Sequence, residues 1–298
     1  MERSPPRIKG LLRKEVGFGC PVVNCGNPYL WYHHFDPPWH VEKHNRPEGM
    51  IALCILHANQ ADAGAFTKDQ LRELKRLGAD NVRGRFEWMR SDLLAVVGGD
   101  LYYRTRTPLM INGERVIWFD RDEHGRLLLS CAMPTRSEEP RLRMQRNDWV
   151  VVGDPTDVVC PPSGRLLRAK YANGDSISIE FRNLESAKEA VRRYPQLLGN
   201  PHDVTGPDWL QSMPEEQLAA VPARIAESLF QARELQERIA GTSNLDLAAV
   251  AFPVTLLEIR LDIGGSPYGL TPHGATFPGF TDGGNFFHRA EVGAQMSM

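Results

Sequence analysis

Short runs of alternating hydrophobic and polar residues dominate the chain from residue 92 onward. Turn-forming pairs such as Asn112-Gly113 and Asn173-Gly174 separate the runs. Side chains alternate between the two faces of a strand, and an Asn-Gly pair between two such runs is a strong hairpin signal. We therefore expect strands over residues 101–104, 115–119, 127–131, 149–152, 166–171, 176–181 and 252–263. This spacing favours an antiparallel β-sandwich, a barrel or a β-solenoid.

Helical patterns precede and interrupt the β-rich region. Thr67 and Gln70 have the spacing of a capping box, Leu71 and Leu74 supply an apolar stripe, and Gly78 is placed to end the helix. Further helices are expected over residues 185–194 and 214–239. The predicted fold class is α+β, with a small N-terminal domain and a larger, mainly antiparallel β domain that contains a few helices.

The chain has 298 residues and is 42% hydrophobic, which is enough for two domains with real cores. We expect a flexible basic arm over residues 1–15, a compact domain over 16–90 and a β-rich domain over 91–298. No stretch approaches the roughly 18 uncharged apolar residues of a membrane span, and the basic start has no apolar signal region. The expectation is a soluble, cytoplasmic protein with no membrane partner.

Charge is distributed unevenly, although the formal net charge of the chain is only −2. Residues 1–90 contain fourteen Lys and Arg against ten Asp and Glu, so the remainder of the chain is acidic. The N-terminal part is therefore the better candidate for binding phosphates. A solvated helix face such as residues 68–76 produces the same excess without any ligand.

Three of the five cysteines lie in the first sixty residues, beside several histidines. Cys20-x4-Cys25 and Cys54-x2-His57 are two knuckles about thirty residues apart, and together they offer a closed tetrahedral set of zinc ligands. Four protein ligands leave no open position, so this zinc is predicted to be structural. The remaining cysteines are expected to be small buried residues without a role; these are Cys131 and Cys160.

An aromatic segment between the knuckles, residues 29–37, ends in the doublet His33-His34 and a proline turn, and Met50 to Cys54 leads into the second knuckle. These features resemble the HNH, or ββα-metal, nucleases. In that family a His-His or Asp-His doublet closes the first strand, an Asn follows in the loop, and further metal ligands return on the helix. The resemblance covers only the N-terminal part, and we recognise no family in residues 92–298.

The resemblance implies a zinc-braced ββα-metal finger that hydrolyses DNA phosphodiester bonds. By analogy, His33 and Asp62 would bind the catalytic Mg²⁺ or Mn²⁺, because a carboxylate suits either ion. His34 would be the general base that takes a proton from the attacking water. Asn45 would supply the loop asparagine.

Two positions depart from the family pattern. The loop asparagine falls on Gly49, and the first helix ligand falls on Ala58. Ala58 has two interpretations: the module has become a binding finger, or a histidine has been replaced deliberately. For His33 and His34 the alternative to catalysis is packing against Trp31 and Trp39 or completion of the zinc shell, while His40 and His44 are expected on the loop surface.

DNA is the expected partner. Basic residues would contact its backbone, and the candidates are Arg46, Arg83 and Arg85. The alternative is that these arginines are ordinary surface residues. The ribbon over residues 141–149 is either part of a nucleic-acid groove or the polar face of a hairpin. HNH modules with an appended domain occur in antiphage systems, so a defence effector with a sensing partner protein, and a homo-oligomer, are further expectations. The rival hypotheses are a non-catalytic zinc-stabilised binding module and an assembly subunit.

Overall fold

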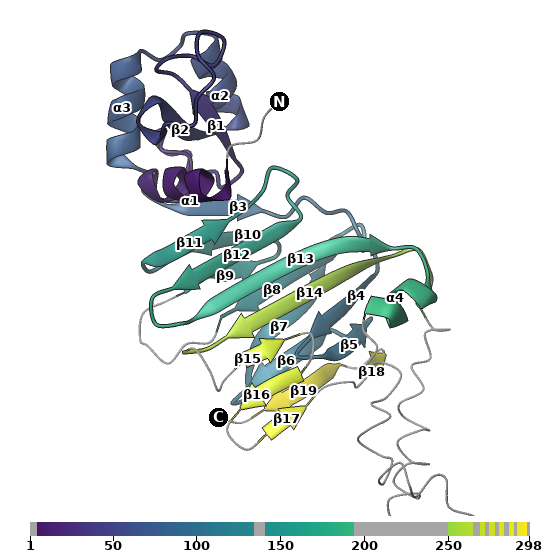
Figure 1. Ribbon diagram of the computed structural model, residues 1–298. Coiled ribbons are helices and arrows are strands. Elements are labelled where there is room, and N and C mark those ends of the chain that lie inside the picture. Colours follow the sequence, from purple (N-terminus) through teal and green to yellow (C-terminus); the bar gives the residue numbers. More distant parts are fainter. Residues whose placement is uncertain are drawn as a thin grey trace, which may run out of the picture.

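The computed structural model describes residues 5–133, 141–193 and 250–264, and further along the chain residues 269–271, 274–277, 280–282, 286–288 and 291–296. A small N-terminal module, defined here as residues 6–79, stands at one end of a larger two-sheet domain (Figure 1). Most described helices belong to the module and most strands to the larger domain, which confirms the α+β class. The helix expected over 214–239 lies outside the described residues.

Two short strands form the centre of the module. β1 (Leu30–His34) pairs antiparallel with β2 (Met50–Cys54), so that His33 lies opposite Ile51 and His34 opposite Met50. Around them lie α1 (Pro6–Glu15), η1 (Pro47–Gly49), α2 (Ile55–Asp62) and α3 (Lys68–Leu77). Every residue of β2 is buried in the module's own hydrophobic core. The order β1, β2, α2 is the expected strand–strand–helix arrangement.

Helix α3 begins and ends where the sequence indicates. The Thr67 side chain accepts a hydrogen bond from the Gln70 amide at 3.2 Å, and the Gln70 side chain accepts one from the Thr67 amide at 2.8 Å. This capping box satisfies two amide groups that the first helical turn leaves without partners. Gly78 ends the helix with a φ of 73°, a backbone conformation that favours glycine.

Residues 6–15 form helix α1, which corrects our expectation of a flexible arm. Leu12 is fully buried in the module core. Arg13 reaches across to the larger domain, where its Nε donates to the Val158 carbonyl at 3.1 Å and its Nη2 lies 3.0 Å from Asp157 Oδ1. Lys9 lies over the Tyr32 ring. Burial of one apolar face is therefore what fixes this basic segment as a helix.

The larger domain contains two sheets that pack face to face (Figure 1). The seven-stranded sheet has the order β19 (Val292–Met296), β6 (Thr107–Ile111), β7 (Glu114–Arg121), β8 (Leu127–Ala132), β9 (Arg143–Gln145), β10 (Asp148–Val151) and β3 (Val82–Arg85). Because β3 pairs with β10, the expected domain boundary at residue 90 is too late, and the module ends before Val82.

The ten-stranded sheet is mixed. Its main path runs through β11 (Pro155–Val159), β12 (Leu166–Tyr171), β13 (Ser176–Leu184), β14 (Val254–Asp262), β15 (Gly269–Thr271), β16 (Gly274–Phe277) and β17 (Phe280–Asp282). A branch adds β4 (Leu93–Val97), β5 (Asp100–Tyr103) and β18 (Phe286–His288). Parallel pairing, which we did not expect, joins β4 to β14, β5 to β18 and β6 to β19.

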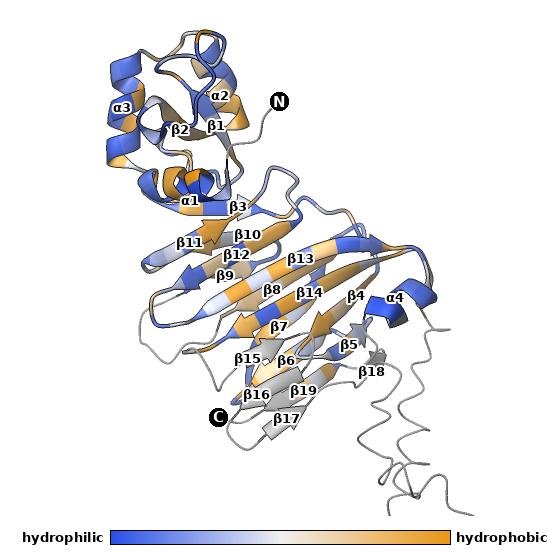
Figure 2. Ribbon diagram, in the orientation of Figure 1, coloured by the Kyte–Doolittle hydropathy of each residue, from blue (hydrophilic) through white to orange (hydrophobic). Residues whose placement is uncertain are grey.

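A single hydrophobic core fills the space between the sheets, so the sandwich is the correct choice among the three expected architectures. Phe119 and Leu129 contribute from one sheet, and Leu167 and Ile259 from the other. A second core lies on the outer face of the larger sheet, under α4 (Ala187–Arg193). In Figure 2 the strands carry mixed hydrophobic and hydrophilic residues, whereas α3 and α4 are largely hydrophilic. Among the described helices, none has the length and apolar character needed to cross a membrane.

Candidate functional site

Four side chains from the two knuckles converge in the module, as the spacing predicted. Cys20 Sγ and Cys54 Sγ each lie 3.2 Å from His57 Nδ1, and Cys25 Sγ lies 3.9 Å from Cys54 Sγ. All four ligand atoms lie within 4.8 Å of one another. A tetrahedral zinc ion with ordinary Zn–S and Zn–N bonds needs about 3.8 Å between sulfurs and about 3.6 Å between sulfur and nitrogen. The cluster therefore fits a structural metal ion such as Zn²⁺.

Local backbone geometry explains how the first knuckle presents its thiols. The Cys25 amide donates to the Val22 carbonyl at 2.9 Å, and the Gly26 amide donates to the Cys20 carbonyl at 3.2 Å. Asn24 and Gly26 have φ values of 63° and 59°, in the left-handed region that a tight turn requires. The second knuckle uses a strand-to-helix junction, since Cys54 ends β2 and His57 lies in the first turn of α2.

The protonation of the cluster also suits a cation. Burial raises the pKa of the Cys20 and Cys25 thiols, so thiolates here need a positive charge beside them. Burial lowers the pKa of His57, which keeps its imidazole neutral and able to act as a ligand. A divalent ion bound by all four groups would supply the missing charge.

A second pair of possible ligands lies at the junction of β1 and α2. His33 Nδ1 is 3.1 Å from Asp62 Oδ1, with the His33 side chain only 9% exposed and the Asp62 side chain 72% exposed. Two ligands at 2.0–2.1 Å from an octahedral cation lie about 3.0 Å apart when they are adjacent. Burial lowers the pKa of His33 although Asp62 opposes the shift, so the imidazole stays neutral. The two residues that the resemblance implied as cation ligands therefore lie together, at a distance that equally suits a direct hydrogen bond.

His34 lies toward the loop that joins the two strands. Its Nε2 is 2.9 Å from the His44 carbonyl, and its ring centroid lies 4.7 Å from that of Trp39. A carbonyl only accepts, so Nε2 carries the proton and Nδ1 keeps its lone pair. Burial, with the nearby His44 and His33, lowers the pKa of His34. The ring contact with Trp39 is the packing that the non-catalytic alternative expects.

His44 is buried, which corrects our placement of this residue on the loop surface. Its Nε2 donates to the Pro37 carbonyl at 2.9 Å, and its Nδ1 accepts from the Arg46 amide at 3.1 Å. Both ring nitrogens are therefore used to fold the loop whose carbonyl orients His34. Sequence reasoning missed this role because nothing local distinguishes His44 from the exposed His40. Neither His33 nor His34 belongs to the Cys3His cluster.

The departures from the nuclease pattern have different structural settings. Gly49 accepts hydrogen bonds from the amides of Phe35 and Asp36, and a Cβ at Gly49 would lie only 2.0 Å from the Asp36 carbonyl oxygen. A side chain does not fit at this position, so an asparagine could not stand at this point of the loop. Asn45 lies in the loop beside His44, and its buried Oδ1 has no hydrogen-bond partner among the residues that the structure describes. Ala58 faces the module core, 8% exposed.

The three candidate arginines do not form one surface. Arg46 makes two hydrogen bonds to Glu42, at 2.8 and 2.9 Å. Arg83 and Arg85 lie on β3 of the sandwich, where Arg83 donates to the Asn24 carbonyl of the first knuckle at 2.8 Å and Arg85 pairs with an aspartate of β10. The Arg83 contact joins the first knuckle to the sheet, whereas the Arg85 pair lies within the sheet. Arg46 alone lies in the same loop as the residues that contact His34.

Comparisons with known proteins add no further assignment. No protein-family model matches the chain. No curated protein and no solved structure matches it either. The resemblance to HNH nucleases therefore rests on the residues themselves and on the geometry described above.

Proposed function

We propose that the N-terminal module is a metal-dependent endonuclease of the HNH type that hydrolyses DNA phosphodiester bonds. The observation that carries the proposal is the 3.1 Å approach of His33 Nδ1 to Asp62 Oδ1, directly beside His34 on the same strand. A cation ligand pair next to a neutral, oriented imidazole is the minimum set for metal-assisted phosphodiester hydrolysis. The Cys3His cluster supports this set by tying the start of α2 to the end of β2.

In this proposal His34 is the general base. The His44 carbonyl fixes the Nε2–H tautomer, so the Nδ1 lone pair is the atom that accepts a proton from water. The lowered pKa keeps His34 unprotonated near pH 7. When bound at His33 and Asp62, Mg²⁺ or Mn²⁺ would neutralise charge on the phosphate. Asn45 and Arg46 follow His44 in the loop and are the nearest candidates for contacts with the DNA backbone.

A second candidate function is a zinc-stabilised binding module without catalytic activity. Ala58 favours it, because the alanine side chain gives no ligand at the position one helical turn before Asp62. Two protein ligands hold Mg²⁺ or Mn²⁺ weakly, and such sites depend on substrate phosphates for the rest of the coordination. The nuclease therefore predicts weak cleavage whose rate depends on the metal concentration. The binding module predicts DNA binding without cleavage.

The test is nicking of supercoiled plasmid by the full chain, with Mn²⁺ raised from micromolar to tens of millimolar. Nicking should require the divalent ion and should fall by at least about a hundredfold in His34→Ala, because general-base catalysis contributes about 10²–10⁴. Asp62→Asn should shift the metal dependence to higher concentration. His40→Ala is the matched control, since His40 is an exposed histidine of the same loop.

Two outcomes would remove the nuclease proposal. One is nicking that is equal in His34→Ala and His40→Ala, which indicates a contaminating activity. The other is DNA binding with a steep salt dependence but no cleavage at any metal concentration, which supports the binding module instead. Zinc content should be measured for each variant, because loss of the Cys3His ion would unfold the module and mimic loss of a catalytic residue.

A further inference from the structure

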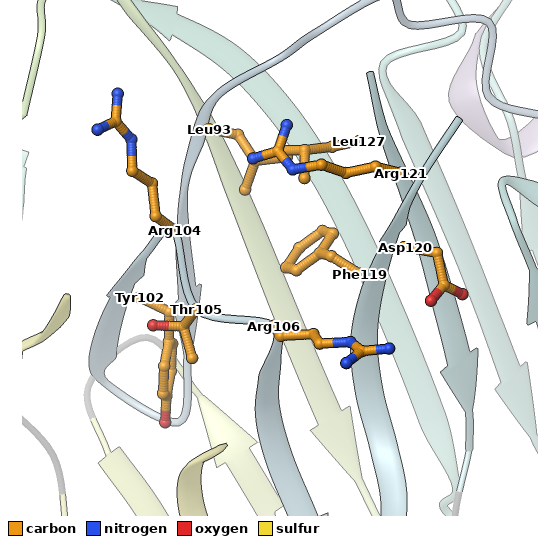
Figure 3. Close-up of a pocket in the computed structure, with 9 residues that line it drawn as sticks. All are labelled: Leu93, Tyr102, Arg104, Thr105, Arg106, Phe119, Asp120, Arg121 and Leu127. Carbon is orange, nitrogen blue, oxygen red and sulfur yellow. The ribbon is translucent and has the colours of Figure 1, made fainter. Parts of the chain in front are cut away.

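The β domain contains a cavity that the proposed nuclease site does not use. Its volume is 340 Å³, and it opens between β4 and β5 of the larger sheet and β7 and β8 of the smaller one (Figure 3). Nine residues line it: Leu93, Tyr102, Arg104, Thr105, Arg106, Phe119, Asp120, Arg121 and Leu127. The volume falls at the lower end of the range for small-molecule sites, about 300–1,000 Å³. We call this cavity the arginine pocket.

The floor of the arginine pocket is apolar. Leu93, Phe119 and Leu127 are 3%, 5% and 8% exposed, and they belong to the core between the two sheets. The Phe119 ring lies at the centre of the view in Figure 3, between the arginines. A flat ring placed on Phe119 would make an aromatic contact and cover apolar surface. The floor therefore favours a ligand with an aromatic body over a bare inorganic ion.

The rim carries three guanidinium groups from two connected segments. Arg104 and Arg106 come from the turn after β5, and Arg121 ends β7. Arg104 has a φ of 57°, which is uncommon for a residue other than glycine. Its guanidinium is held by Asp92, with N–O distances of 2.7 to 3.1 Å. This ion pair positions Arg104 at the mouth of the pocket and neutralises its charge.

Arg121 keeps its positive charge, whereas the charge of Arg104 is neutralised by Asp92. Its Nη1 donates to two carbonyls, those of Ser91 at 2.9 Å and Gly125 at 2.6 Å. In the part of the chain that the structure describes, no carboxylate lies within ion-pair distance of Arg121, and the Asp120 carboxylate points away from the Phe119 ring (Figure 3). Arg106 pairs with Glu291 at 3.1 Å, but both side chains are more than half exposed. Such surface pairs contribute little and exchange readily.

We propose that the arginine pocket binds a mononucleotide-like anion, with its ring against the apolar floor at Phe119 and its phosphate at Arg121. Guanidinium groups bind phosphate through paired N–H donors, so the charge that Arg121 keeps suits a phosphate. The site lies in the β domain and is independent of the proposed nuclease chemistry, so either proposal can fail without the other.

The test is calorimetric titration of the full chain with AMP, GMP, CMP and UMP, with adenosine and inorganic phosphate as partial probes. At least one nucleotide should bind with a Kd below 1 mM, and each partial probe should bind at least about tenfold more weakly. Arg121→Gln should raise the nucleotide Kd about tenfold or more, because it removes a charged hydrogen-bond donor. Arg168→Gln on β12 is the control, an exposed arginine outside the pocket.

Phe119→Leu separates the ring contact from the charge, since it keeps an apolar floor and removes the aromatic face. It should weaken the nucleotide but leave any binding of inorganic phosphate unchanged, and circular dichroism checks that the sandwich is intact. The proposal is overturned if no nucleotide binds below 1 mM, or if Arg121→Gln and Arg168→Gln behave alike. Binding of a DNA oligonucleotide without any mononucleotide would also overturn it, as would phosphate binding as tightly as the nucleotides.

Discussion

Replacing Ala58 with histidine is the sharpest test of how the module is built. Position 58 lies one helical turn before Asp62 on α2, so the two Cβ atoms are about 5–6 Å apart on one face of the helix. Asp62 in turn lies 3.1 Å from His33. An imidazole at position 58 would therefore stand beside the existing pair of ligands and convert a two-ligand site into a three-ligand site.

The size of the effect follows from two opposing contributions. Ala58 is 8% exposed in the module core, and a larger side chain at a packed position costs about 1–3 kcal/mol. Structural zinc contributes roughly 10–16 kcal/mol in isolated zinc-finger peptides, so the module should stay folded. Loss of groups that merely support a ligand weakens metal sites by about 10–100-fold. A third direct ligand should therefore tighten Mn²⁺ binding by at least about tenfold.

The assay is calorimetric titration of zinc-loaded protein with Mn²⁺, together with plasmid nicking. Asn59→His is the matched control, because it adds the same imidazole about 100° further round α2 on an exposed position. Ala58→His should bind Mn²⁺ more tightly and nick faster than Asn59→His. Equal Mn²⁺ affinity in the two variants would refute the placement of the cation between β1 and α2.

Three further predictions concern stability and pH. Leu12→Ala should lower the free energy of unfolding in urea by about 2–5 kcal/mol, because Leu12 is fully buried. The control Leu11→Ala should lower it by less than about 1 kcal/mol, because Leu11 is 43% exposed. Equal losses would mean that α1 does not pack on the module core. Cys54→Ser should reduce bound zinc below one ion per chain and destabilise the module, as measured by metal analysis and proteolysis, and retention of one zinc would exclude the Cys3His site. The nicking rate should fall as the pH drops through the pKa of His34, which burial holds below the ordinary value for histidine, because protonation removes the base; a rate that rises with acidity would contradict that role.

Features that depend on neighbouring residues could be predicted from the sequence. The capping box at Thr67 is local, because its two hydrogen bonds join residues three positions apart. The Asn112-Gly113 and Asn173-Gly174 turns likewise connect strands that are consecutive in the chain. The Cys3His cluster was predictable although its knuckles lie far apart, because three cysteines and a histidine with this spacing are the usual ligands of a tetrahedral metal site.

Only the tertiary structure decided the features that depend on distant partners. Residues 93–97 form a uniformly apolar run, which is a central strand because one core covers one face and a second core covers the other. Leu12 fixes α1 only because the core under β2 accepts it, and the arginine pocket exists because a turn after β5 meets the end of β7. Helix-capping hydrogen bonds and turn preferences depend on a few neighbouring residues, so they can be predicted from the sequence. Burial acts between segments that are far apart in the chain, and its result appears only when the chain is folded.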